Sequence, residues 1–173
     1  MRNLVGIKPQ DILLLLKLAT SPGLSQKNLA DQLQVSQAEI SHGFKRLKNA
    51  QLINAQGRII KEACIEFLVH AVKYIYPAQL GSPALGLPTA FAHPEFKFTK
   101  YGPEDVMVWP HPEGKVKGVA LFPIYPTLTQ ACVSDRTLYK LASFVEMIRA
   151  GRTRERKIGA EKLQELIEEL NEK

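Results

Sequence analysis

Hydrophobic residues in the first part of the chain recur at the three- and four-residue spacing of amphipathic helices. This spacing predicts helices over residues 9–19, 25–33, 36–49 and 60–76. The first of them is apolar on nearly all sides from Ile12 to Leu16, whereas one apolar face suffices for the core of a small monomer. We therefore expect a second copy of the chain to cover part of this helix.

Capping residues locate the second and third helices. Ser25 and Ser36 precede them as N-caps, and Glu39 would complete a capping box with Ser36. Only Gln34 and Val35 separate the two helices, which is typical of a helix-turn-helix. The apolar pairs at positions 52–53 and 59–60 then flank a short polar segment with a glycine near its tip, which predicts a hairpin.

The rest of the chain divides into a proline-rich segment and a helical end. Nine of the eleven prolines lie between residues 77 and 126, so long helices are excluded there. Residues 106–109 and 116–122 look like two strands joined into a β-hairpin by a turn with an early proline and a late glycine. Helical spacing returns from Ser134, first in a helix that ends near Gly151 and then in a Glu-rich amphipathic helix. The predicted fold class is α+β, with units at residues 1–76, 77–133 and 134–173.

The segment from Leu24 to Leu47 resembles the winged helix-turn-helix of MarR-like bacterial transcription regulators. A small Ala30 stands where the two helices approach each other, and Val35 plugs the turn. The resemblance covers about residues 8–76. It departs at Gln34, where the family usually has a glycine, and at Gly43 in the middle of the third helix. It implies that the third helix enters the DNA major groove and that the hairpin is a wing.

A helical wheel of the third helix separates a buried face from an outward face. Ile40, Phe44 and Leu47 should pack on the first two helices. The residues that would read base edges lie outward in the first two turns: Gln37, Ala38, Ser41 and His42. The residues that would hold phosphates surround them: Ser25, Lys27, Ser36, Lys45, Arg46, Lys48 and Arg58.

Charge along the chain supports a polyanionic partner. The net charge is +6, and residues 1–60 alone hold eight Lys and Arg against three Asp and Glu. Double-stranded DNA is the partner we expect, because each phosphate contact releases condensed counterions. A second basic cluster would either touch flanking DNA or pair with the acidic C-terminal helix: Arg149, Arg152, Arg154, Arg156 and Lys157.

Other chemistry has little support in the sequence. There is no glycine-rich phosphate loop and no nucleophile with a base at a recognisable spacing, so we expect no catalytic residues and no cofactor. We also expect no metal site, because the candidate ligands fall in no metal-binding spacing: Cys64, His70, His93, His111 and Cys132. The lack of a long apolar run and of a secretory signal favours a cytoplasmic protein with no membrane partner.

These observations favour a sequence-specific DNA-binding transcriptional regulator that acts as a homodimeric repressor. Two alternatives stay open. In the first, the chain is an antitoxin or defence-system accessory protein that binds a protein partner through residues 77–173. In the second, it is a ligand-sensing regulator with an apolar pocket lined by aromatic residues: Phe91, Tyr101, Trp109 and Phe122.

Overall fold

The computed structural model describes residues 6–97 and 102–172. Its first part contains three helices, a hairpin closed by one bridge between Ile53 and Ile59, and a helical segment interrupted by a π-helical turn (Phe67–Ala71). The helices of this part are α1 (Pro9–Thr20), α2 (Gln26–Leu33), α3 (Gln37–Asn49), α4 (Lys61–Glu66) and α5 (Val72–Ile75). The predicted helices are confirmed, with ends that differ by one residue at most.

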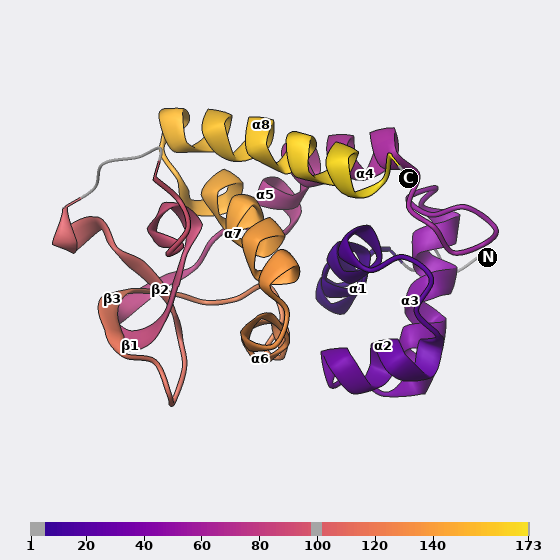
Figure 1. The fold of residues 1–173 in the computed structure, drawn as a ribbon, viewed down its shortest axis with the longest axis horizontal. Helices are drawn as coiled ribbons and strands as arrows, with labels where there is room; N and C mark the ends of the chain where they lie inside the picture. Colours follow the sequence, from indigo (N-terminus) through magenta and orange to yellow (C-terminus); the bar gives the residue numbers. More distant parts are fainter. Residues whose placement is uncertain (1–5, 98–101, 173) are drawn as a thin grey trace.

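The second part adds a small sheet and three further helices, which confirms the α+β fold class. Short 3₁₀ turns at Ala90–Ala92 and Pro103–Asp105 lie between the first and the second strand. The elements are β1 (Leu80–Thr89), β2 (Met107–Pro110), β3 (Val116–Leu121), α6 (Leu128–Val133), α7 (Arg136–Ala150) and α8 (Thr153–Leu170). The sheet lies at one end of the long axis and α3 at the other, while α8 runs along the molecule between them (Figure 1).

The strands form a closed barrel of three, and the predicted β-hairpin is wrong. β2 and β3 each pair with β1 in antiparallel fashion, and they pair with each other in parallel. The sequence analysis missed β1 because its glycines and prolines are rare in strands. Gly86 makes the closure possible, since a Cβ there would lie 2.1 Å from the carbonyl oxygen of Trp109.

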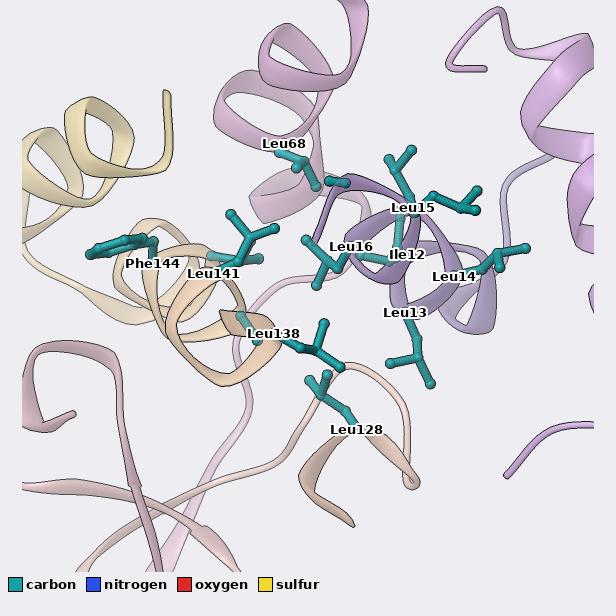
Figure 2. Close-up of a cluster of buried hydrophobic side chains, with 14 of the residues drawn as sticks. Ile12, Leu13, Leu14, Leu15, Leu16, Leu68, Leu128, Leu138, Leu141 and Phe144 are labelled. Atoms are coloured by element: carbon teal, nitrogen blue, oxygen red, sulfur yellow. The ribbon is translucent and has the colours of Figure 1, made fainter. Parts of the chain in front are cut away.

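Helix α1 lies in the middle of the hydrophobic core. Every residue from Asp11 to Ala19 is buried. Its leucines leave the helix in different directions (Figure 2). Leu15 lies on the side of Leu68, Leu16 faces Leu141, and Leu14 lies on the side away from Leu141. The chain's own C-terminal helices therefore cover the surface that we had assigned to a second copy, and the all-round apolar character of α1 no longer supports a dimer.

A buried polar chain links the barrel to the end of α5. The indole of Trp109 donates to Glu146 (3.1 Å), and Glu146 pairs with Arg149 (2.6 Å). Arg149 also donates to the carbonyl oxygens of Tyr76 (2.8 Å) and Pro77 (3.3 Å). Burial raises the pKa of Glu146, and Arg149 opposes that rise. These contacts tie the three parts of the chain into one structure.

The π-helical turn changes which residues of the fourth predicted helix are buried. Cys64 and Leu68 lie in the core, but Ile75, which follows at the same helical spacing, is 50% exposed. A π turn inserts an extra residue into the helical repeat, so the residues after it rotate. Val72 is fully buried after this turn, whereas Ala71 is only partly buried and Ile75 is exposed.

Candidate nucleic-acid interface

The turn between α2 and α3 is short and capped at both ends. Gln34 ends α2 in the left-handed conformation (φ 53°), and the amide of Val35 donates to the carbonyl oxygen of Ala30 (3.1 Å). The hydroxyl of Ser25 accepts from the amide of Asn28, and that of Ser36 accepts from the amide of Glu39, both at 3.2 Å. Both predicted N-caps are confirmed.

The face of α3 that turns away from the core carries the predicted base-reading residues. Gln37, Ala38 and His42 are exposed, and Ser41 is half-buried. On the opposite face Ile40 and Leu47 are buried, while Phe44 is partly buried. The helical wheel therefore placed the two faces of this helix correctly.

Arg46 belongs to the inner face, so the prediction that it holds a phosphate is wrong. Its guanidinium is buried and binds both carboxylate oxygens of Asp11, at 2.7 and 2.8 Å, and it also contacts Glu39. The hydrogen bond to Asp11 and, after it, that to Glu39 raise the pKa of Arg46 above its ordinary value. This bidentate pair fastens α3 to α1.

Glu39 does not complete the predicted capping box. Its carboxylate accepts from Arg46 and from Gln10 (3.1 Å) instead of from the amide of Ser36. Burial works against its charge, but these hydrogen bonds lower its pKa overall. Asp11, Glu39 and Arg46, with Gln10, form an inner network of ion pairs and hydrogen bonds. The charge of Glu39 is neutralised within this network, so Glu39 adds little negative charge to the outer face of α3.

The hairpin after α3 has the residues that a tight turn requires. The amide of Arg58 donates to the Asn54 side chain (3.0 Å), and Gly57 has a φ of 79°, which favours glycine. A Cβ at Gly57 would lie 2.7 Å from the ring of Phe44, so the hairpin tip rests on α3. Arg58 is exposed at this tip.

The remaining predicted phosphate contacts are exposed cations and caps. Lys27, Lys45 and Lys48 are exposed, as are the caps Ser25 and Ser36. Lys48 donates to the carbonyl oxygen of Ala55 in the hairpin (3.0 Å). With Arg58, these residues provide exposed positive charge and capped helix starts on α2, on α3 and in the hairpin, which is the chemistry that a phosphate backbone requires.

The second basic cluster is divided and lies far from α3. Arg149 is buried in the polar chain described above, so its predicted DNA contact is wrong. Arg152, Arg154, Arg156 and Lys157 are exposed, but they lie at the barrel end of α8, at the opposite end of the molecule from α3 (Figure 1). Arg152 pairs with Asp105 rather than with the acidic residues of α8 (3.5 Å).

The predicted aromatic pocket is not formed by the described residues. Trp109 is fully buried, Phe91 is nearly so, and Phe122 is 49% exposed, while Tyr101 lies outside the described residues. Within residues 6–97 and 102–172, no three His, Cys, Asp or Glu side chains gather as ligands for a metal ion. In the same ranges no helix is long and apolar enough to cross a membrane.

Sequence reasoning missed the inner network that holds α3. Asp11 interrupts the apolar side of α1, and a charge within an all-round buried helix requires a partner. That signal was present in the sequence, but it did not identify Arg46 as the partner.

Searches of protein-family models, of curated proteins and of solved structures find no significant match to this chain.

Proposed function

We propose that this chain binds double-stranded DNA through α3 and the hairpin, in the manner of a winged helix-turn-helix, and that it regulates transcription. The observation that carries the proposal is the contrast between the two faces of α3. The inner face is fixed to α1 by the buried pair between Arg46 and Asp11. The outer face is mostly polar and exposed, and exposed cations lie on α2, on α3 and in the hairpin.

A rigidly held helix with such a face suits recognition in the major groove, which admits one helix. Gln37, Ser41 and His42 would meet base edges, and Gln37 would bind adenine through two hydrogen bonds. Lys27, Lys45 and Lys48 would hold phosphates on either side, while Arg58 would reach the adjacent backbone or minor groove. Repression would follow from occupancy of a promoter.

Selection of binding sites from a random DNA library tests the proposal. We expect enrichment of a defined sequence. On that sequence Gln37→Ala should cost about 1 to 3 kcal/mol of binding free energy and leave scrambled DNA almost unaffected. Lys45→Ala should weaken both duplexes alike and reduce the slope of log affinity against log salt by about one.

The control variant is Lys117→Ala, which removes an exposed cation from β3 at the opposite end of the molecule. It should leave binding to both duplexes unchanged. Equal losses for Gln37→Ala on selected and scrambled DNA would show that α3 does not read bases. A library that yields no enriched sequence would contradict sequence-specific binding altogether.

A protein-binding role for residues 77–173 has one specific observation in its favour. Leu80 and Phe122 are exposed by 55% and 49%, and Ile75 lines the same surface hollow as Phe122. If this surface pairs two copies, sedimentation at micromolar concentration should give a homodimer that Phe122→Ser converts to a monomer. A wild-type monomer that enriches no DNA would favour the antitoxin or accessory-protein alternative.

A further inference from the structure

Ala38 places an exposed apolar group on the otherwise polar outer face of α3. It follows Gln37 in the first turn of the helix, and Ser41 and His42 lie one turn further along on the same face. The hydroxyl of Ser36 fixes the start of this turn, because it accepts from the amide of Glu39 (3.2 Å). An alanine side chain has no rotamers to lose, so its methyl group has one fixed place on this face.

The cations of α3 stand beyond its first two turns. Lys45 and Lys48 are exposed there, and Arg46 between them is buried against Asp11. Arg and Lys are the side chains that most often read guanine in the major groove, through O6 and N7. Residues 37–44 contain neither Arg nor Lys. The turns that would meet the base edges therefore lack the usual reader of guanine.

The first two residues of α3 instead match the groups that an A·T pair displays in the major groove. Adenine presents N7 and the N6 amino group, which one glutamine side chain binds together, and thymine presents its C5 methyl group, which alanine contacts. Ser41 and His42 can each donate or accept a hydrogen bond, so they fit more than one base. The sequence preference therefore falls to Gln37 and Ala38.

The inner contacts of α3 make a single methyl contact matter. The guanidinium of Arg46 fastens α3 to α1 through both oxygens of Asp11, at 2.7 and 2.8 Å. On the hairpin side, Gly57 lies close against the ring of Phe44. A helix held in this way cannot shift readily to replace a lost contact with DNA, so each contact on its outer face counts.

We propose that α3 recognises an A·T base pair by the 5-methyl group of its thymine, which packs on the Cβ of Ala38, beside an adenine bound by Gln37. The inference rests on the proposed function and adds which base pair the first turn of α3 selects. Alanine also favours helices for reasons unrelated to DNA. The test must therefore change the methyl group of the DNA as well as that of the protein.

Uracil removes this methyl group from the DNA and keeps the base pair. Each thymine of the library-selected sequence is replaced in turn by uracil, and the affinity of the unaltered protein is measured by fluorescence anisotropy. We expect a loss of about three- to fivefold at a thymine next to the recognised adenine, as expected for one buried methyl group. No loss at any thymine, or a selected sequence without an A·T pair, would overturn this inference and leave DNA binding through α3 intact. A library without an enriched sequence would overturn both.

Ala38→Gly tests whether Ala38 makes the contact. It should weaken binding to the thymine duplex by about the same three- to fivefold and abolish the response to uracil, because each methyl group would then lack its partner. The matched control is Ala50→Gly at the exposed C-cap of α3, which should retain the response. Circular dichroism checks that both variants fold. An undiminished response to uracil in Ala38→Gly would overturn the assignment to Ala38.

Discussion

Gln34 adopts a backbone conformation that suits glycine better than glutamine. Its φ of 53° places it in the left-handed region at the end of α2, where a side chain costs about 1 to 2 kcal/mol. Glycine avoids that cost but loses about 0.5 to 1 kcal/mol more conformational freedom on folding. We therefore expect Gln34→Gly to raise the free energy of unfolding by about 0.5 to 1 kcal/mol, as measured by urea denaturation.

The matched control for this substitution is Gln32→Gly, two residues earlier and also exposed, but inside α2. There glycine should lower the free energy of unfolding by about 1 kcal/mol, because the helical conformation gives it no advantage. A lower free energy of unfolding for both glycine variants would contradict the left-handed conformation assigned to Gln34.

The buried side chain of His93 should make the folded protein less stable in mild acid. The imidazole is buried between Phe96 and Tyr139, with ring centroids 4.4 and 4.1 Å away, and its Nδ1 accepts from the amide of Glu95 (3.2 Å). Burial lowers the pKa of His93 to about 4; Glu95 opposes this, and Lys140 and Arg136 add to it. In the unfolded chain the ordinary pKa is about 6.5, so only the unfolded state gains a proton as the pH falls below that value.

The stability contribution of a neutral His93 is complete above pH 6.5 and is lost as the pH falls toward 4. Between pH 7 and pH 5 the loss should be about 2 kcal/mol, since one pKa unit corresponds to about 1.4 kcal/mol. Urea denaturation at the two pH values measures it, and His93→Phe should remove this component. An identical pH dependence in the variant would show that other groups cause the loss.

At the scale of single elements, the sequence was most informative where local chemistry fixes the structure. Ser25 and Ser36 begin helices, and Asp135 caps α7 by accepting from the amide of Leu138 (2.9 Å), as their side chains predict. β1 could not be predicted, because its stability comes from two distant strands rather than from its own residues. The partner of Asp11 was missed for the same reason, since it lies 35 residues away.

The contact between α1 and α3 explains Gly43. A Cβ at this position would lie 2.9 Å from Leu14 Cδ2 and 3.0 Å from Asp11 Oδ1. Neither atom has room to move, because Leu14 is buried in the core and Asp11 is held by Arg46. Glycine thus allows the two helices to approach where the buried ion pair forms.

We expect Gly43→Ala to lower the free energy of unfolding by about 1 to 2 kcal/mol, even though alanine favours helices by about 1 kcal/mol. Ser41→Ala on the outer face should change it by less than about 0.5 kcal/mol. Chemical denaturation of both variants measures the difference. A more stable Gly43→Ala protein would mean that α1 and α3 are not in close contact.

At the scale of the whole molecule, the first helix is buried by residues from both ends of the chain. Its apolar positions cluster with those of α7 and α8 as well as with those of α2 and α3. The sequence showed that α1 needed cover on nearly all sides, but it could not show whether a second copy or the same chain provides that cover. The structure describes one continuous core, so the boundary predicted at residue 76 does not divide it.

Because α1 and the barrel share one core, we expect a destabilising substitution in α1 to destabilise the barrel as well. Leu13 is fully buried in α1, and Trp109, the only tryptophan, is fully buried in β2. Leu13→Ala should cost about 2 to 5 kcal/mol of the free energy of unfolding. Far-ultraviolet circular dichroism follows mainly the helices, and tryptophan fluorescence follows the barrel. Both transitions should move together to lower urea concentration. If residues 1–76 fold independently, the variant will shift the helical signal alone and leave the fluorescence transition at its wild-type midpoint.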